Sequence, residues 1–263
     1  MPIALKKRDR ASAQLEKPDS PTDGKPKSSF GEDLRSVKTW FQNLVVPTLQ
    51  GRAACKPTMP AVIPTVIDEL RQVMGPPTKS ASDWTFVDLG CGEGTMLQPM
   101  RQATFEGGRP MFERVVGVEL DPKTYRHAVR SAANDPRIKV ECGDLFPFVE
   151  KACKGKLYGG RAAFYVYEPL WMAGIPEAEM ERLYGGLLEA VAKHPGSIVV
   201  YCSADAYREI STSLLESKGL VLRRKAQVAQ NGAFNKIRGR YNPLELWQVP
   251  YKTEAGPEKK RRK

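Results

Sequence analysis

The strongest constraint on the fold comes from residues 86–96, which read FVDLGCGEGTM. An apolar run ends in Asp88, and glycines follow at the alternate positions Gly90, Gly92 and Gly94. Glycine permits a tight turn and lets the backbone approach a ligand without a Cβ atom in between. Because a helical pattern comes next, we expect a strand, a sharp turn and a helix whose free N–H groups face a ligand.

The same order of strand and helix recurs along the next part of the chain. The expected strands span 84–90, 114–120, 137–145, 161–169 and 197–203, and the expected helices span 94–103, 176–193 and 205–218, with another opening at Asp121-Pro122. Aspartate is a favoured N-cap residue and proline a favoured first helical residue. Strands this dense in apolar and β-branched residues are typical of parallel strands covered on both faces, which predicts a Rossmann-like, doubly wound α/β fold.

The carboxyl-terminal part of the chain has a different pattern. Residues 220–230 and 235–249 are strand-like runs, and the Asn231-Gly232 pair between them is a strong hairpin signal. We therefore expect a seven-strand sheet that is mostly parallel and ends in an antiparallel β-hairpin.

Composition excludes several classes of protein. The five cysteines are an odd number without metal-ligand spacing, and both histidines lie far from any cysteine pair, so we expect free thiols in a reducing compartment and no metal site. No apolar run approaches the roughly 20 residues that span a bilayer, so we expect no membrane partner. The net charge of +11 favours an anionic partner.

The acid beside the glycines restricts the kind of ligand. The spacing is G-x-G-x-G rather than the dinucleotide G-x-G-x-x-G, and no Gly-Lys-Ser/Thr follows as in a phosphate loop. A fixed carboxylate at Asp88 would repel a pyrophosphate and suits a cationic amino group, which S-adenosylmethionine carries. Here the chain resembles the class I, seven-strand S-adenosylmethionine-dependent methyltransferases, whose first motif matches FVDLGCGEG.

That resemblance covers about residues 60–249 and implies a set of cofactor-binding residues. Glu119, at the end of the second strand, would accept hydrogen bonds from ribose hydroxyls. Asp144, after the third strand, would accept from the adenine amino group, with Leu120 and Leu145 flanking the ring. The glycine-rich turn would bind the amino-acid end through Asp88, Gly90, Cys91, Gly92, Glu93 and Gly94. Cys91 is expected to be a small spacer, and 105–114 an inserted loop.

The segment after the fourth strand decides the acceptor in this family. It reads FYVYEPLW (164–171), which is similar to the Asn/Asp-Pro-Pro-aromatic motif of amino-group methyltransferases. The resemblance implies that Glu168 accepts from or orients an amine and that Trp171 forms a wall of its pocket. Tyr167, with Tyr165 and Trp171, would desolvate a lysine ammonium and favour the neutral amine. The alternative is that Glu168 only binds the amino end of the cofactor.

The preferred acceptor is a protein lysine, including histone lysine. The FVDLG…GVEL pairing resembles the seven-strand histone-lysine methyltransferases, although their Asn-Asn-Phe-Ala-Phe segment is absent. YVYEPL also resembles a bacterial group with Tyr-Leu-Tyr-Asn-Pro-Phe at strand four. The alternatives are an RNA or small-molecule methyltransferase and a non-catalytic RNA- or chromatin-binding subunit.

Composition and apolar spacing also divide the chain into segments. These are a disordered basic tail (1–32), a helical extension or lid (33–80) with helices at 33–49 and about 64–74, the catalytic domain (81–250) and a second basic tail (251–263).

A run of basic residues in the hairpin suggests a nucleic-acid contact. Residues 222–240 contain six basic residues and no acid, and the chain ends in KKRRK. The candidate phosphate ligands are Arg223, Arg224, Lys225, Lys236, Arg238, Arg240 and the carboxyl-terminal tail. The alternative is a solvated edge hairpin protected by its charge. Such a chain is expected in the cytoplasm or the nucleus.

Overall fold

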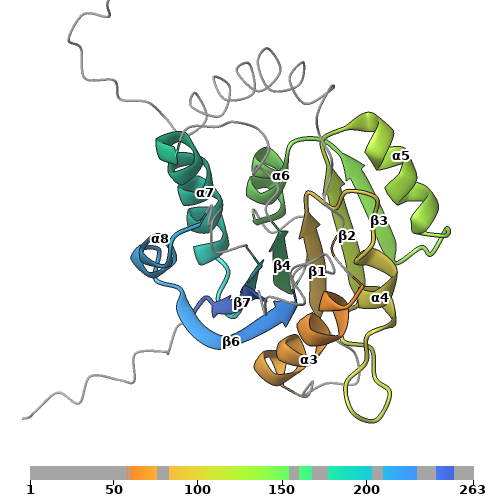
Figure 1. Cartoon of the computed structure of the whole chain (residues 1–263), viewed down its shortest axis with the longest axis horizontal. Coiled ribbons are helices and arrows are strands. Elements are labelled where there is room, and N and C mark those ends of the chain that lie inside the picture. Colours follow the sequence, from red (N-terminus) through yellow and green to blue (C-terminus); the bar gives the residue numbers. More distant parts are fainter. Residues whose placement is uncertain are drawn as a thin grey trace, which may run out of the picture.

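One seven-stranded sheet with helices on both faces organises the chain (Figure 1). The computed structural model describes residues 58, 60–75, 83–153, 160–167, 177–202, 210–229 and 241–251. The strands are β1 (Trp84–Leu89), β2 (Arg114–Glu119), β3 (Ile138–Cys142), β4 (Arg161–Tyr167), β5 (Ile198–Cys202), β6 (Val221–Ala229) and β7 (Tyr241–Gln248). The helices are α3 (Val62–Met74), α4 (Leu97–Gln102), α5 (Pro122–Ser131), α6 (Leu145–Lys151), α7 (Glu177–Ala192) and α8 (Thr212–Ser217).

The strand order is β3-β2-β1-β4-β5-β7-β6. The first five strands pair in parallel, whereas β7 is antiparallel to both β5 and β6. This arrangement confirms the predicted fold class, a doubly wound and mostly parallel sheet that ends in an antiparallel hairpin. The strands follow one another outward from β1 to β3 on one side and from β4 to β5 on the other, so the strand order switches between β1 and β4. This places a switch point beside the glycine-rich turn, where ligands bind in open α/β sheets.

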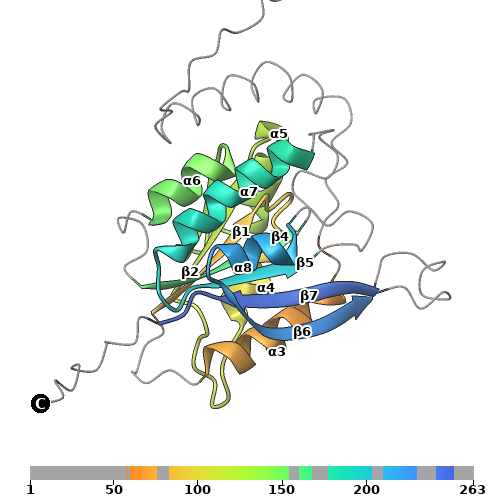
Figure 2. The ribbon, with the colours of Figure 1, turned by 90° about the vertical axis from the view of Figure 1, so that its left-hand side faces the viewer.

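Helices cover the two faces of the sheet in separate layers. Helices α6 and α7 lie on one face, and α3 and α4 lie on the other (Figure 2). Alternate residues of each strand serve the two layers: Val87 packs into the core beneath α6, α7 and α8, while Phe86 packs into the core beneath α3, α4 and α5. Strands buried on both faces explain the nearly unbroken apolar pattern of the sequence.

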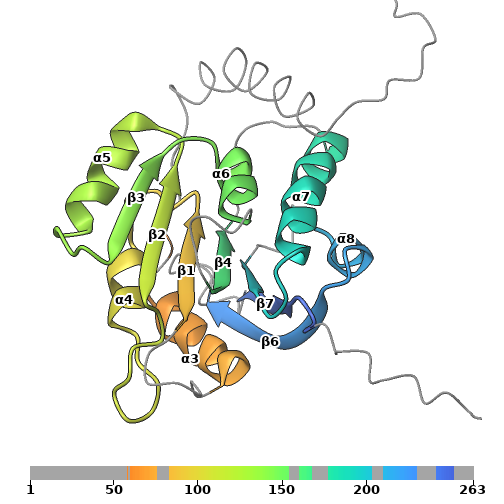
Figure 3. The same ribbon diagram turned by 180° about the vertical axis from the view of Figure 1, so that it is seen from behind.

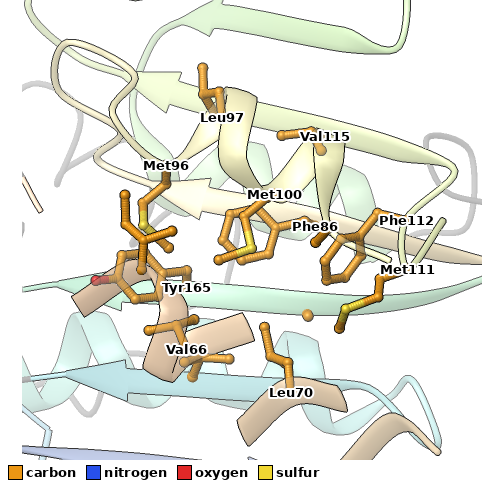
Figure 4. Close-up of a cluster of buried hydrophobic side chains, with 14 of the residues drawn as sticks. Val66, Leu70, Phe86, Met96, Leu97, Met100, Met111, Phe112, Val115 and Tyr165 are labelled. Carbon is orange, nitrogen blue, oxygen red and sulfur yellow. The ribbon is translucent and has the colours of Figure 1, made fainter. Parts of the chain in front are cut away.

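The second of these cores contains both α3 and the predicted inserted loop (Figure 4). Val66 and Leu70 of α3 are fully buried against it. The Phe86 ring lies 5.4 Å from that of Phe112, which is in the loop, and 6.1 Å from that of Tyr165. The residues of the loop are therefore part of the core, and α3, which was expected from about residue 64, packs against β6 and β7.

Two local predictions were wrong near the carboxyl ends of the strands. The first helix begins at Leu97 rather than Gly94, because turns occupy the residues after the glycines. The third strand ends at Cys142, and the unexpected helix α6 begins at Leu145. Asp144 caps α6 by accepting from the N–H of Phe146. The last residues of the predicted strand 137–145 therefore belong to the start of a helix.

The hairpin formed as predicted, but not with a two-residue turn. Ala229 pairs with Tyr241, so Asn231-Gly232 does not directly join the paired strands, and residues 230–240 lie outside the described part. The buried residues Val228 and Leu244 fix the register of β6 against β7 on the core face. This burial outweighs the local turn signal of Asn231-Gly232.

Several predictions fall partly or wholly outside the described residues. They are the tails 1–32 and 252–263, the helix at 33–49 and the first part of the helix at 205–218, whose described remainder is α8. In the described ranges, every helix is too short or too polar to cross a bilayer.

The tightest constraint in β2 is at Gly117, and it gives a first prediction. A Cβ at this position would lie 2.8 Å from Cys91 Sγ and 3.1 Å from Cys91 Cβ. We expect Gly117→Ala to lower the free energy of unfolding by about 1–3 kcal/mol in urea denaturation, because overpacking forces the turn to move.

Gly143→Ala is the control, since a Cβ there meets nothing within 4 Å. It should change stability by less than about 1 kcal/mol. Cys91→Ala should offset part of the Gly117→Ala cost in the double variant. Strictly additive costs would show that Cys91 is not what opposes the added methyl group.

Candidate functional site

The predicted ligand-binding residues come together at one edge of the sheet. Asp88 is the next-to-last residue of β1, Glu119 ends β2, Asp144 follows β3 and Tyr167 ends β4. These four strands are neighbours and parallel, so their carboxyl ends lie side by side (Figure 3). The structure thus places the predicted residues from four separate segments along one edge.

The glycine-rich turn has the backbone conformation that its sequence predicts. Gly90, Gly92 and Gly94 have φ values of +81°, +55° and +82°. The N–H groups of Gly90 and Cys91 both donate to the carbonyl oxygen of Val118, at 2.9 Å each. Residues with a Cβ rarely adopt such φ values, so the turn requires glycine at these positions.

A carboxylate of β2 holds this turn in place. Glu119 Oε2 accepts from the N–H of Gly92, and Glu119 Oε1 accepts from the N–H of Asp121, both at 2.9 Å. Burial raises the pKa of Glu119, and these N–H bonds oppose that rise. Since each carboxylate oxygen has two lone pairs, Glu119 retains the capacity to accept from ligand hydroxyls.

Asp88 is the most deeply buried acid of the site, with 4% of its surface exposed. Burial, and after it the nearby charge of Glu119, raise the pKa of Asp88 to about 8. A buried carboxylate without a compensating cation is costly, so a positively charged ligand group would relieve this cost. These residues therefore fit a cationic amino group and disfavour a phosphate.

The residues expected around an adenine ring have structural roles as well. Asp144 Oδ1 accepts from the N–H of Phe146 at 2.9 Å and caps α6. Leu145 is nearly buried in the core under α6 and α7, and Leu120 packs against the same core while half-exposed. Leu120 therefore presents more surface to a ligand than Leu145 does. The side chain of Glu93 is exposed.

The end of β4 carries an aromatic pair. The rings of Tyr165 and Tyr167 are stacked, with centroids 6.4 Å apart and an interplanar angle of 12°. Tyr165 is fully buried, and burial raises its pKa well above the usual range. Its hydroxyl lies 3.3 Å from Thr58 Oγ1. Glu168 and Trp171, the other predicted acceptor residues, lie outside the described residues.

Thr58 was not expected at this site. It precedes Tyr165 by 107 positions, and a single threonine in the segment before α3 carries no sequence signal of its own. Only the packing of α3 on the sheet brings Thr58 to the carboxyl edge.

The described basic residues of the hairpin all have partners within the chain. Arg224 forms an ion pair with Glu69 of α3, and its Nη2 donates to Glu69 Oε1 at 3.3 Å. Arg223 donates to Gln248, and Lys225 Nζ lies 3.0 Å from the buried Glu245. The remaining candidates, Lys236, Arg238, Arg240 and the tail, lie outside the described residues. These contacts tie β6 to α3 and β7.

The described cysteines, Cys91, Cys142, Cys153 and Cys202, are free thiols. Burial raises the pKa of Cys153 to about 12, which makes it a poor nucleophile. Within the described segments, no three His, Cys, Asp or Glu side chains gather in a metal-binding group.

The seven-strand order, the antiparallel hairpin and the glycine-rich turn together define the class I methyltransferase fold. The sequence matches no protein-family model and no curated relative.

Three solved structures illustrate the likeness in fold. The N-methyltransferase NodS from Bradyrhizobium japonicum WM9, in complex with S-adenosyl-L-homocysteine, is 14% identical, with 82% of this chain and 97% of that chain covered and a TM-score of 0.48. An RNA methyltransferase from Salinibacter ruber, in complex with the same compound, is 19% identical (77% and 97% covered, TM-score 0.40). Aeropyrum pernix fibrillarin, with natively bound S-adenosyl-L-methionine, is 18% identical (70% and 74% covered, TM-score 0.44). Likenesses this distant carry no argument about activity.

The raised pKa of Asp88 predicts a pH-dependent stability. The native carboxyl keeps its proton up to about pH 8, whereas the unfolded one ionises near 3.8. Unfolding between these values releases a proton, so the contribution of Asp88 to stability is full below the unfolded pKa and is lost as pH rises toward 8. We expect the stability of the wild type relative to Asp88→Asn to fall as the pH of urea titrations is raised through this window.

Asp68→Asn is the matched control, because Asp68 is exposed on α3. The stability difference between this variant and the wild type should not vary with pH in the same window. A flat difference for Asp88→Asn as well would show that the native carboxyl is already ionised.

Proposed function

We propose that this protein is an S-adenosylmethionine-dependent methyltransferase that acts on an amine. The observation that carries the proposal is the buried carboxylate of Asp88, which sits beside a glycine-rich turn that Glu119 holds in place. A carboxylate at this position suits the cationic amino-acid end of S-adenosylmethionine. The fold supports the proposal because its switch point lies at the same place.

Each residue of the site would have a separate task. Asp88 would accept from the amino group, which would lower its pKa and release its proton. Glu119 would accept from the ribose hydroxyls with its remaining lone pairs. Asp144 has one oxygen in the helix cap, and its other oxygen would accept from the adenine amino group. Leu120 would pack against the ring.

The acceptor would lie beyond the end of β4. Bound S-adenosylmethionine would supply an electrophilic methyl group for in-line displacement by an amine, with the S–C bond electrons passing to sulfur. Tyr167 would exclude water from the amine, and a neutral amine is favoured where water is excluded. Glu168 would orient the amine and accept its proton, and Trp171 would close the pocket. The enzyme mainly holds acceptor and donor in near-attack geometry.

For the acceptor we propose a protein lysine. The partly exposed Tyr167, which stacks on the buried ring of Tyr165, supports this choice, because an aromatic wall suits the apolar stem of a lysine side chain and disfavours its ammonium form. The basic tail 251–263 is compatible with a nuclear or a cytoplasmic location. The second candidate is an RNA acceptor. The basic side chains of α5 favour this candidate.

Cofactor binding gives the most direct test of the activity. We expect calorimetry to detect binding of S-adenosylmethionine to the full chain. Asp88→Asn should weaken it by roughly 10- to 100-fold, because a charge-assisted hydrogen bond contributes about 1.5–3 kcal/mol. Near neutral pH, binding to the wild type should also release a proton, which is measured as a dependence of the heat on the buffer.

Asp68→Asn should bind S-adenosylmethionine as tightly as the wild type does, since Asp68 is on the exposed side of α3. If the wild type does not bind S-adenosylmethionine, or if Asp88→Asn binds equally well, the methyltransferase proposal fails.

The acceptor class can be tested by transfer of tritiated methyl groups into a fractionated lysate. We expect label that protease removes and RNase leaves intact, with Glu168→Gln giving far less of it. Label removed by RNase alone would reject the lysine proposal in favour of RNA.

A further inference from the structure

Helix α5 carries a row of basic side chains that the proposed activity does not use. Lys123, Arg126, His127 and Arg130, which we call the basic stripe, occupy positions i, i+3, i+4 and i+7, so they share one helix face. All four line the same hollow on the surface. The helix contains no acidic residue between its first and last positions. The stripe is therefore a strongly positive surface.

The opposite side of α5 explains why the stripe faces outward. Ala128 is fully buried and lies against the glycine-rich turn, where a Cβ on Gly94 would meet it at 3.2 Å or just above. Ala132, which follows the helix, is also buried. The helix lies along the outer side of β3, at the end of the sheet away from β6 (Figures 1 and 3).

The charges of the stripe are not neutralised by nearby acids. In the described part of the chain, no ion pair or side-chain hydrogen bond involves Arg126, His127 or Arg130. The neighbouring acids have other partners: Asp135 pairs with Arg101 and Arg137, and Glu141 pairs with Lys139. Asp121 caps the helix through Thr124, although its charge also interacts with Lys123.

Among the described residues, the basic side chains of β6 differ from those of the stripe. Arg223, Arg224 and Lys225, the described basic residues of β6, each contact an acidic or amide side chain of the same chain. Within the described ranges, the only such contact of the stripe is the charge interaction of Lys123 with Asp121. Positive charge that the protein does not itself neutralise attracts anionic partners.

We propose that the basic stripe binds the phosphate backbone of a single nucleic-acid strand. Arginine and lysine are the usual phosphate ligands, and arginine can bind a phosphate through two parallel N–H bonds. At about 1.5 Å rise per residue the stripe is roughly 10 Å long, enough for a few consecutive phosphates. A protein partner fits less well, because protein interfaces have an apolar or aromatic centre, which these four side chains do not provide.

The position of the stripe relates it to the candidate site. Helix α5 begins directly after β2, and the N–H of Asp121 donates to Glu119, so the Lys123 end of the stripe lies next to the carboxyl edge of the sheet. A strand bound along the stripe would run toward that edge. The binding itself requires no methyl transfer, so it can be tested independently of the proposed activity.

The test is fluorescence anisotropy of a short labelled single-stranded RNA with the full chain, in the absence of S-adenosylmethionine and over a range of salt concentrations. The variant Arg126→Gln with Arg130→Gln should bind roughly 10- to 30-fold more weakly near 0.1 M salt. Its salt dependence should be shallower by about 1.4, because each contact to a single strand contributes about 0.7.

Two control variants show whether position or net charge matters. Arg114→Gln with Lys193→Gln removes the same charge from exposed residues at the start of β2 and directly after α7, near the opposite edge of the strands, and should change affinity by less than about threefold. Arg126→Lys with Arg130→Lys keeps the charge of the stripe and should retain most of the affinity. Circular dichroism melting of each variant verifies that it is folded.

Three outcomes would overturn the proposal. They are a wild type that does not bind RNA at low salt, an equal loss in the stripe variant and the Arg114/Lys193 variant, and competition by polyglutamate that is as effective as competition by unlabelled RNA. The last result would identify an acidic protein as the better partner.

Discussion

The hydrogen bond from the N–H of Gly92 to Glu119 is the contact on which the site depends. It joins the turn after β1 to the end of β2, and the carbonyl of Val118 binds the same turn through Gly90 and Cys91. With both ends held, the backbone keeps the positive φ values that only glycine adopts easily. The buried carboxylate of Asp88 is thereby fixed before any ligand arrives, which is the preorganisation that binding sites need.

Two acids at this edge have raised pKa values, and this explains why the site suits a cation. Burial is the larger cause for both Asp88 and Glu119, and the charge of Glu119 adds to the effect on Asp88. Two backbone N–H groups donate to Glu119 and oppose the rise in its pKa, whereas Asp88 is more deeply buried. A positive ligand group would complete the electrostatics of the site. The basic stripe on α5, in contrast, lies on the outer surface and suits an anion.

Sequence patterns predicted the fold, and the residues that they propose for the cofactor site lie together at one edge of the sheet, because those signals are local. The parallel strands β1, β4 and β5 are buried on both faces, so their composition alone marks them. Asp88 and Glu119 lie at the carboxyl ends of β1 and β2, Asp144 follows β3, and parallel strands bring their carboxyl ends together. The patterns were less accurate at boundaries: the residues after the glycines form turns instead of the first turn of α4, and the capping of α6 by Asp144 shortened the third strand.

The sequence by itself determined the succession of strands and helices along the central part of the chain, the glycine turn and the acids beside it, because each depends on neighbouring residues. Tertiary structure decided the contacts between distant segments: the hydroxyl of Thr58 beside Tyr165, the ion pair of Arg224 with Glu69, and the register that pairs Ala229 with Tyr241. It also decided that the described basic residues of β6 pair with other side chains of the chain, whereas the arginines of α5 form no described ion pair. The physical reason is that burial and charge pairing are properties of the packed chain, and no local pattern encodes which side chains will meet.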